Sequence, residues 1–367
     1  MLLKNIHLQN FRSFNKVSFN FSATTTAIVG PNTAGKTNLL EAVYLLATGK
    51  SFRASLEEEM IQTGTEFSRV KGAITLPAGA DKPAQAGSET LEVILTRGEV
   101  GGERVNRKML KVNNLGKRLV DYQGILRVVI FGPWDLELII DSPSVRRKFL
   151  DSVLLQVDRE YRRSVMAYEK GLRSRNRLLE RIREENLSRS QLLFWDKLLI
   201  KNGDYISQKR EELIDFINQT KPLSNEQFQL IYDKSAISEG RLAQYSQEEV
   251  AAATTLVGPH RDNIIFQVLN SKLQTLNLEV YGSRGEQRMC ALWIKLAELA
   301  FIEQATATRP VLLLDDIFSE LDHEHREVVM NVVGEQQTIL TTADPHMISG
   351  LPAQAGLKNG LEKIELG

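Results

Sequence analysis

One loop near the N-terminus constrains the fold of this chain more than any other stretch. It reads Gly30-Pro31-Asn32-Thr33-Ala34-Gly35-Lys36-Thr37 and fits the pattern G-x-x-x-x-G-K-[ST]. Apolar residues 26–29 precede the loop and an amphipathic segment, 39–47, follows it, which predicts a strand, a loop and a helix. Glycines let a backbone approach an anion, and loop N–H groups with a helix N-terminus supply positive partial charge. The stretch therefore predicts a phosphate-binding loop.

Two side chains of the loop add chemistry that backbone groups lack. Lys36 is a mobile point charge suited to β- and γ-phosphates, and the Thr37 hydroxyl is a hard oxygen ligand for Mg²⁺. The competing explanation is an accidental match, which the correct flanking elements disfavour. We therefore predict that residues 30–37 bind a nucleotide together with Mg²⁺.

Composition places the chain among ordinary globular proteins. Its 367 residues allow two domains or one domain with a large insertion. Because 46 Lys and Arg balance 46 Asp and Glu, a surface that binds nucleic acid must be a local patch. Cys290 is the single cysteine, which excludes an internal disulfide and fits a reducing compartment. The chain has no apolar run of membrane-spanning length and no signal-peptide pattern, so we expect a cytoplasmic protein.

Several segments on both sides of the loop are expected to form strands. Residues 2–8 and 16–21 show strand-like alternation. The ranges 69–76, 90–97, 109–112 and 119–120 predict an antiparallel layer beside the phosphate-loop sheet, and 125–131 reads as a buried strand. Between the first two, Phe11 and Phe14 are expected in the core. Arg12, flanked by these aromatic residues, is a candidate to reach the nucleotide.

The pattern then changes to long helices. Apolar residues recur every three or four positions over 144–185, which predicts one long helix or a broken pair, and again over 191–218. Together they predict an antiparallel helical arm joined at 186–190. Strict heptads are not kept, so an extended coiled coil is not expected. Residues 146–189 carry thirteen Lys and Arg against seven Asp and Glu. This excess is either a solvated helix face or a surface that follows nucleic-acid phosphates.

The segment after the arm contains few candidate functional residues. Residues 222–257 are expected to be a polar return with few strands, before a strand at 264–269. His260 lies in the sequence Gly258-Pro259-His260-Arg261-Asp262 and is expected to be structural, because no partner with metal-ligand spacing lies nearby.

Two carboxylates follow the most apolar strand of the chain. Residues 311–314 read as a central parallel strand buried on both faces, and Asp315 and Asp316 end it. Ligands bind at the C-terminal ends of such strands, so Asp315 is expected to hold Mg²⁺ and Asp316 to polarise the attacking water. A purely structural role is the alternative, although buried tandem carboxylates are costly.

A second candidate site begins a helix just upstream of that strand. Ser283 and Glu286 have the spacing of a capping box at the start of a helix that runs to Gln304. The stretch is either a helix start alone or, with flexible Gly285, a second anion-binding N-terminus aimed at a γ-phosphate. The segment 319–322 and a strand at 338–342 follow the carboxylates.

The order of these motifs resembles the head of ABC-type ATPases and, more specifically, the RecF family of bacterial recombination-repair proteins. The resemblance covers essentially the whole chain. The segments that carry it are Asn10-Phe11-Arg12-Ser13-Phe14, 35–42, Gly49-Lys50-Ser51-Phe52-Arg53, 142–147, Arg175-Asn176, 258–262 and 281–283. It implies an α/β fold, with an ABC-type ATPase head (a mixed phosphate-loop sheet plus an antiparallel layer) over 1–132 and 258–367. The inserted helical arm would occupy 133–257.

The resemblance also implies roles for the motifs. Gly30 to Thr37 would bind ATP, Thr37 and Asp315 would hold Mg²⁺, and Asp316 would stand at the position of the catalytic glutamate, with Lys36 assisting. Ser283, Gly285 and Glu286 would form the signature motif, which in this superfamily reaches the ATP of the opposite subunit. Asp322 would lie in the loop near the dimer interface. The implied partners are gapped or junction DNA, RecO, RecR and a second copy of the chain, with help in loading RecA.

Some features depart from the ABC pattern. Thr33 and Ala34 occupy a loop that commonly carries a glycine, no glutamine loop is recognisable, and residues 342–344 stand where a switch histidine is expected. Asp316 is shorter than glutamate, so slow hydrolysis is expected. The main alternative is an SMC-like scaffold that bridges DNA, which would need longer heptad arms. A transporter ATPase or a metabolic kinase fits these motifs less well.

Overall fold

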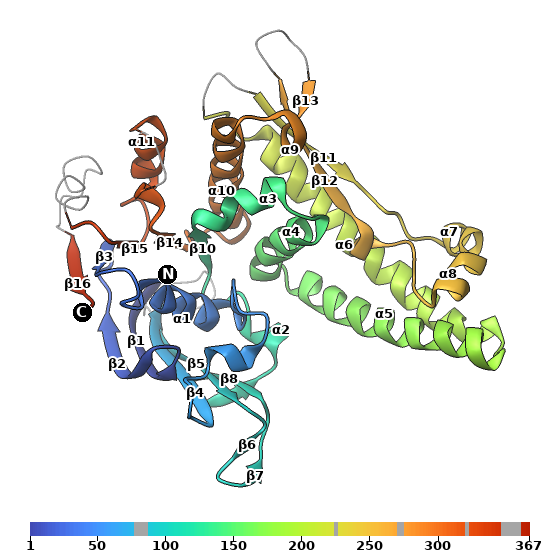
Figure 1. Cartoon of the computed structure of the whole chain (residues 1–367), viewed down its shortest axis with the longest axis horizontal. Coiled ribbons are helices and arrows are strands. Elements are labelled where there is room, and N and C mark those ends of the chain that lie inside the picture. The colour runs from blue at the N-terminus through green and yellow to red at the C-terminus, as the bar shows by residue number, and fades with distance from the viewer. Residues whose placement is uncertain (77–86, 224–226, 270–274, 320–322, 346–360) are drawn as a thin grey trace. The chain divides into compact units, whose positions relative to one another are not determined.

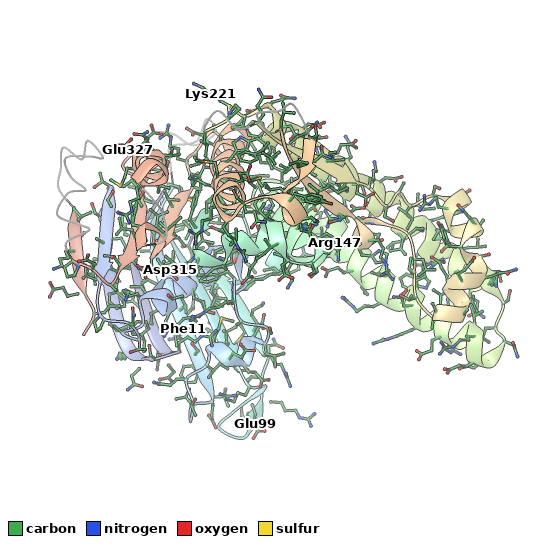
Figure 2. The ribbon with its side chains drawn as sticks, turned by 45° about the horizontal axis from the view of Figure 1, so that its top comes forward. Phe11, Glu99, Arg147, Lys221, Asp315 and Glu327 are labelled. Atoms are coloured by element: carbon green, nitrogen blue, oxygen red, sulfur yellow. The ribbon has the colours of Figure 1, made fainter. Side chains whose placement is uncertain are left out.

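The computed structural model describes residues 1–76, 87–223, 227–269, 275–319, 323–345 and 361–367. These residues pack into two compact units (Figure 1). The first comprises Met1–Trp134 with Ile302–Gly367, and the second comprises Asp135–Phe301. Figure 2 labels Phe11 and Asp315 in the first unit and Arg147 in the second.

A five-stranded sheet in the first unit carries the phosphate loop. Its strand order is β10-β14-β15-β3-β16, and every pairing among these described strands is parallel. The strands are β3 (Thr25–Val29), β10 (Val128–Phe131), β14 (Val311–Asp315), β15 (Thr338–Thr342) and β16 (Glu362–Glu365). Asp315 is in register with Thr341, and Thr341 with Ile28. The ends of β14 and β3 therefore meet at one edge of the sheet, with β15 between them.

A six-stranded antiparallel sheet completes the first unit. Its order is β2-β1-β4-β5-β8-β9, so the antiparallel layer expected over 67–120 is present, and β1 and β2 extend it. The strands are β1 (Leu2–Phe11), β2 (Phe14–Asn20), β4 (Phe67–Thr75), β5 (Ser88–Thr96), β8 (Lys108–Val112) and β9 (Leu115–Lys117), with a separate hairpin of β6 (Glu99–Val100) and β7 (Glu103–Arg104). The strand expected at 119–120 is instead part of the short helix α2 (Leu119–Tyr122). Two buried side chains in four residues suit a helix turn as well as an edge strand.

Helix α1 (Lys36–Thr48) begins directly after the phosphate loop and organises the core of the first unit. It contacts strands of both sheets, including β4 and β14. Leu39, Leu40, Val43 and Leu46 are fully buried in one apolar cluster with side chains of both sheets. Phe11 belongs to this cluster and Phe14 packs against it, as expected. Packing on two sides fixes the helix axis, and with it the position of the loop that precedes the helix.

The second unit is built on long helices. They are α4 (Pro143–Val157), α5 (Arg159–Glu185), α6 (Leu193–Gln219) and α10 (Arg284–Thr306), with the short helices α3 (Glu137–Ile140) and α9 (Leu278–Tyr281). The helical stretch from 144 to 185 is broken at Asp158, where the backbone is extended. The Asp158 side chain caps α5, because its Oδ1 accepts from the Tyr161 N–H at 2.9 Å. Helices α5 and α6 run side by side (Figure 1), as the apolar periodicity predicts.

The segment after α6 differs from expectation. It contains β11 (Gln227–Asp233), α7 (Glu239–Gln244) and α8 (Ser246–Ala252), so the expectation of a strand-poor return is wrong for β11. That strand pairs with β12 (Asn263–Leu269), which pairs with β13 (Thr275–Asn277). In β11, Phe228 and Leu230 are buried and the glutamines between them are exposed. The alternation of apolar and polar residues therefore covers only a few positions and gives a weak strand signal.

The boundaries of the units also differ from the expected domain limits of 132/133 and 257/258. The first boundary shifts by two residues, whereas residues 258–301 belong to the second unit. Pairing of β12 with β11 holds this segment in the arm, and Trp293 of α10 packs on Phe228 with ring centroids 5.9 Å apart. Sequence motifs indicate candidate functional residues. Which unit a segment belongs to depends instead on strand pairing.

Candidate functional site

The two motif glycines of the phosphate loop are closely packed, so neither position has room for a side chain. A Cβ added to Gly30 would lie 2.4 Å from the Leu366 carbonyl oxygen. Gly35 has φ +96°, and a Cβ there would lie 3.0 Å from both Phe14 and Ser13. Thr33 adopts φ 76° although it is β-branched, which is a strained conformation at the position where this loop commonly has glycine.

Lys36 lies inside the loop that precedes it. Its Nζ donates to the carbonyl oxygens of Gly30 at 2.7 Å and Pro31 at 3.0 Å. The side chain is only 8% exposed. The ammonium group is therefore enclosed by the same backbone turn whose N–H groups are expected to hold phosphate.

The two halves of the predicted nucleotide site meet directly. Thr37 Oγ1 donates to Asp315 Oδ2 at 2.7 Å, across 278 positions of sequence. The other carboxylate oxygen of Asp315 accepts from Thr341 Oγ1 at 2.7 Å, and the Asp316 N–H donates to the same hydroxyl at 3.0 Å. Asp316 adopts φ 48°, a left-handed conformation at the end of β14. Thr341 thus orients both carboxylate residues.

These residues surround a cavity of about 250 Å³ in the first unit. Its lining residues are Asn32, Thr33, Gly35, Lys36, Thr37, Asn38, Arg53, Asp315 and Asp316. Loop, helix N-terminus and carboxylates therefore share one cavity, as the sequence predicts.

The donor set at this cavity fits Mg²⁺. Thr37 supplies a hydroxyl oxygen and Asp315 a carboxylate oxygen, both hard ligands, 2.7 Å apart. Within the described ranges, no group of three or more His, Cys, Asp and Glu could hold a metal by itself. One or two protein ligands completed by phosphate oxygens and water is the usual arrangement for Mg²⁺.

Arg53 also lines this cavity, although the motifs did not assign it a role. Its Nη2 donates to Glu41 Oε2 at 2.8 Å and also to Asn38 Oδ1. Asn38 and Glu41 lie three positions apart on one face of α1. The segment Gly49–Arg53 already marked the family resemblance, and a buried glutamate in the apolar helix before it was the available signal for a cationic partner.

Arg12 makes structural contacts in this arrangement. Its guanidinium donates to both carboxylate oxygens of Glu41 at 2.8 Å and to the Glu59 carbonyl oxygen at 2.6 Å. Among the residues that the structure describes, the lining of the cavity includes Arg53 but not Arg12. A nucleotide contact by Arg12 therefore stays a prediction.

Glu41 is fully buried and connects these arginines. Burial by itself would raise the pKa of Glu41, but hydrogen bonds from Arg12, Arg53 and Ser51 outweigh it and lower the pKa. The carboxylate is therefore ionised at neutral pH and fixes the Arg53 guanidinium at the cavity wall.

The predicted signature stretch begins helix α10 in the second unit. The Ser283 N–H donates to Glu286 Oε2 at 2.7 Å, and the Glu286 N–H donates to Ser283 Oγ at 3.2 Å. This is the capping box that the sequence predicts. Ser283 and Gly285 are exposed, and the neighbouring Val280 and Tyr281 are 66% and 70% exposed. Asp322 lies outside the described residues.

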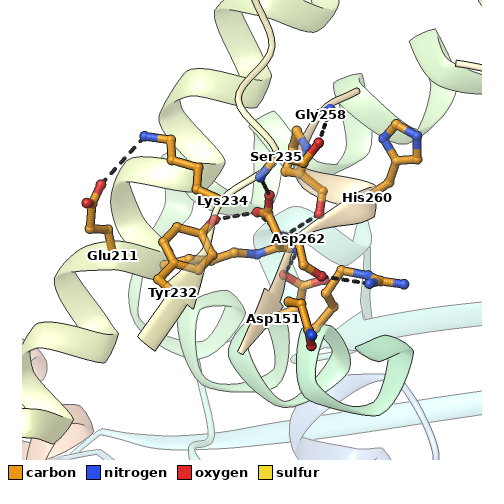
Figure 3. Close-up of polar contacts among 12 residues, drawn as sticks. Asp151, Glu211, Tyr232, Lys234, Ser235, Gly258, His260 and Asp262 are labelled. Atoms are coloured by element: carbon orange, nitrogen blue, oxygen red, sulfur yellow. Dashed lines mark hydrogen bonds and ion pairs between the residues drawn. The ribbon is translucent and has the colours of Figure 1, made fainter. Parts of the chain in front are cut away.

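The sequence 258–262 contributes a buried polar network to the second unit (Figure 3). Asp262 accepts from Arg210 at 3.0 Å, from the Ser235 N–H at 2.8 Å, and from the Tyr232 hydroxyl. His260 Nδ1 lies 2.8 Å from the Tyr168 hydroxyl and Nε2 lies 3.0 Å from the Thr255 carbonyl oxygen. Burial lowers the pKa of His260 to about 4. Both ring nitrogens are occupied, which agrees with a structural histidine.

Comparison with known proteins identifies the family. The family model described as RecF/RecN/SMC N terminal domain matches residues 2–363. A DNA replication and repair protein RecF from Herpetosiphon aurantiacus is 33% identical, over 94% of both chains. A solved structure of the recombination mediator protein RecF with ATP in the RecFOR pathway is 31% identical, with a TM-score of 0.82 over 93% of this chain and 92% of that one.

A more distant likeness concerns the fold alone. The Smc head domain from Pyrococcus furiosus, bound to the C-terminal domain of ScpA, is 17% identical, with a TM-score of 0.54 over 100% of this chain and 94% of that one. It agrees with the expected ATPase-head architecture of parallel and antiparallel sheets. Among the described helices, none is both long and apolar enough to cross a membrane. The near full-length matches decide the assignment: the chain belongs to the RecF family of DNA replication and repair proteins.

Proposed function

We propose that this protein is an ATP-dependent DNA-binding protein of recombinational repair and replication maintenance, in which ATP closes a dimer on gapped or junction DNA. The observation that carries the proposal is the 2.7 Å hydrogen bond between Thr37 and Asp315, because it joins the phosphate loop to the carboxylate strand. Lys36 faces the same cavity. The related RecF structure with ATP supports the choice of nucleotide.

Each residue of the cavity has a defined task in this proposal. The N–H groups of residues 30–37 cradle the phosphates, and Lys36 exchanges its carbonyl contacts for phosphate oxygens. Thr37 and Asp315 hold Mg²⁺, which supplies charge neutralisation between the β- and γ-phosphates when bound. Thr341 keeps the Asp315 carboxylate oriented. Asp316 polarises the attacking water, and its short side chain makes hydrolysis slow.

Arg53 adds a second cation to the cavity wall. Its guanidinium is fixed by Glu41 and Asn38 rather than by solvent, so little conformational freedom is lost when an anion binds. We assign it to a phosphate group of the nucleotide. A guanidinium held in one orientation offers paired donors that match phosphate oxygens.

Dimerisation is the second part of the proposal. Ser283, Gly285 and Glu286 of one subunit would reach the ATP held by the other, with Asp322 near the interface. The exposed N-terminus of α10 offers positive partial charge, and the exposed Val280 and Tyr281 beside it suit a surface that another protein covers. Hydrolysis removes the γ-phosphate that both subunits contact and lets the dimer open.

The biological setting comes from the family. Curated relatives are named DNA replication and repair proteins, and the related structure is placed in the RecFOR pathway. We therefore propose RecO and RecR as partners, and assistance in loading RecA on gapped DNA as the result.

Two substitutions test the ATP-driven dimer. Lys36→Ala should lower nucleotide affinity by at least tenfold and abolish ATP-dependent dimerisation, because the cavity loses its enclosed cation. Ser283→Ala should leave nucleotide binding by the monomer unchanged but weaken the dimer. Equilibrium binding of a fluorescent ATP analogue and sedimentation with ATP measure the two properties separately. Equal loss of nucleotide binding in both variants would contradict the assignment of Ser283 to the opposite subunit.

A further inference from the structure

The outer face of α5 carries a line of cations. At about 100° per residue, eight positions fall within roughly 40° of one line along the helix, and the last of them, near its C-terminus, is the acidic Glu184. The other seven are Arg159, Arg163, Met166, Lys170, Arg173, Arg177 and Arg181, all exposed. We name this set the α5 stripe. It spans about 33 Å at 1.5 Å per residue, and the acidic residues Glu160, Glu169 and Glu180 lie to its sides.

The α5 stripe is separate from the face that folds the arm. Tyr161, Val165, Tyr168, Leu179 and Ile182 of the same helix are buried and face the rest of the unit. Since the apolar face already anchors the helix, the stripe cations are not needed to hold it in place. Their arrangement calls for another explanation.

Burial divides the arginines of the arm into two groups. Arg175 is 2% exposed and donates to Asp196 and Glu249 at 2.7 Å, and Arg146 donates to backbone carbonyls and to Glu279. These are structural arginines. The stripe cations are exposed, and the ion-pair partners of Arg163, Arg173 and Arg181 are exposed as well, such as Glu160 for Arg163 at 3.3 Å. The local excess of positive charge therefore reaches solvent along one line.

The ion pairs along the α5 stripe are weak enough to exchange. Arg173 lies 4.0 Å from Glu169, and Arg181 lies 3.0 Å from Glu185. Each of these four side chains is at least half exposed. Exposed pairs of this kind contribute little to stability and are screened by salt. Lys170 and Arg177 have no ion pair within the described part of the chain. A row of phosphates could replace these carboxylates at little cost.

We propose that the α5 stripe follows the phosphate backbone of DNA. This inference rests on the proposed DNA binding and names the surface that performs it. Duplex DNA carries one charge per 3.4 Å of axis on each strand, so the stripe matches the length of about ten base pairs. Most of its cations are arginines, whose planar donors suit phosphate oxygens. Contacts to phosphates alone carry no sequence information, so binding through this surface is independent of sequence.

An acidic protein surface is the rival partner for such a stripe. Stable protein interfaces have an apolar, charge-depleted core, with charges at the rim. The α5 stripe has the opposite composition, because Met166 is its only large apolar side chain and cations continue on both sides of it. The composition therefore favours DNA.

Two charge-matched double variants test the proposal. The stripe variant is Lys170→Gln/Arg177→Gln, and the control is Arg189→Gln/Lys197→Gln, which also removes one exposed lysine and one exposed arginine from the arm. None of the four has an ion pair among the described residues. Binding of fluorescent gapped duplex is measured by anisotropy with ATP and Mg²⁺, at several salt concentrations. ATP-dependent dimerisation is measured in parallel by sedimentation.

The salt dependence separates the outcomes. For the stripe variant, the slope of log K against log salt should become shallower by about two, since each lost phosphate contact contributes about 0.9. The control should keep the wild-type slope, and both variants should still dimerise. An unchanged slope in the stripe variant overturns the inference. If DNA binding is unchanged but poly-L-glutamate binding is lost, the surface serves an acidic protein instead. If the wild-type protein with ATP does not bind DNA, the proposed function fails first.

A second measurement uses the single cysteine, which is fully buried. Met166→Cys places a unique accessible thiol inside the α5 stripe. Gln208→Cys, at an exposed position of α6, is the matched control. Each variant carries an environment-sensitive fluorophore. DNA with ATP should change the emission at position 166 and leave position 208 unchanged. Equal responses at both positions, or none at 166, overturn the assignment to α5.

Discussion

At the scale of single residues, His260 couples the titration of a side chain to the folding of the second unit. Burial is the main cause of its low pKa, and the nearby charges of Arg261 and Arg147 act in the same direction. The Thr255 carbonyl oxygen and Asp262 oppose them without reversing the shift. The folded state therefore holds the imidazole neutral between Tyr168 and Thr255.

This leads to a prediction about pH. The pKa of His260 is about 4 in the folded state against about 6.5 when unfolded, so the unfolded chain binds the proton more tightly. The neutral, buried imidazole adds about 3 kcal/mol to the free energy of unfolding above pH 6.5. This contribution decreases as the pH falls and is lost below about pH 4. Urea unfolding of the wild type and His260→Gln from pH 4 to 7.5 should show this stability difference shrinking as pH falls. A difference that does not vary with pH would contradict the prediction.

The sequence predicts candidate site residues only where they belong to a recognisable motif. The motifs of Lys36, Thr37 and Asp315 predict a shared site because their residue types and spacing are those of phosphate and Mg²⁺ binding, and the structure places all three at one cavity. Arg53 has no such motif, because its position depends on Glu41, a buried partner on the preceding helix. A single arginine in a loop gives no periodic signal.

At the scale of elements, α1 acts as a support for the cavity. Lys36, Thr37 and Asn38 in the first turn of the helix line the cavity, and Glu41 lies about one turn further along. Glu41 holds Arg12 from before the loop and Arg53 from after the helix, and accepts from Ser51 at 2.6 Å. One buried carboxylate thereby ties two chain segments to the helix, one before the phosphate loop and one after the helix.

Two substitutions distinguish the structural role of Glu41 from the proposed nucleotide contact of Arg53. Glu41→Gln should destabilise the protein by about 2 kcal/mol, since two partly exposed guanidinium groups lose a buried carboxylate. Arg53→Gln should cost less than about 1 kcal/mol in stability but weaken ATP binding about tenfold. Arg97→Gln, in an exposed pair with Glu58, is the control for loss of a surface charge. Denaturant unfolding and nucleotide titration measure the two effects. Unchanged ATP affinity in Arg53→Gln would remove its assigned role.

Elements with a strong period were predictable and short ones were not. Helices α5 and α6 and strand β14 follow apolar patterns of 3.6 residues or continuous burial. Strand β11 is not predictable from its sequence because only Phe228 and Leu230 mark its inner face. Helix α2 resembles a strand in sequence because four residues are too few to distinguish a helical from a strand period.

At the scale of the whole molecule, the proposal requires two copies to complete one nucleotide site. Sedimentation of the wild type should show a monomer without nucleotide, a dimer with ATP, and a larger complex with ATP and gapped DNA. Lys36→Ala should stay monomeric under all three conditions. A protein that bridges two DNA molecules without ATP, seen by co-sedimentation of differently labelled duplexes, would instead support an SMC-like scaffold.

The sequence by itself determined the local chemistry: a phosphate loop between strand and helix, two carboxylates after a buried strand, and a long basic arm. These follow from residue types at short spacing, where backbone geometry leaves few choices. Only the tertiary structure decided which distant groups meet. The β3-β15-β14 order brings Thr37 to Asp315, and β11 holds residues 258–269 in the second unit. Pairing between strands depends on contacts far apart in the chain, which no local pattern specifies.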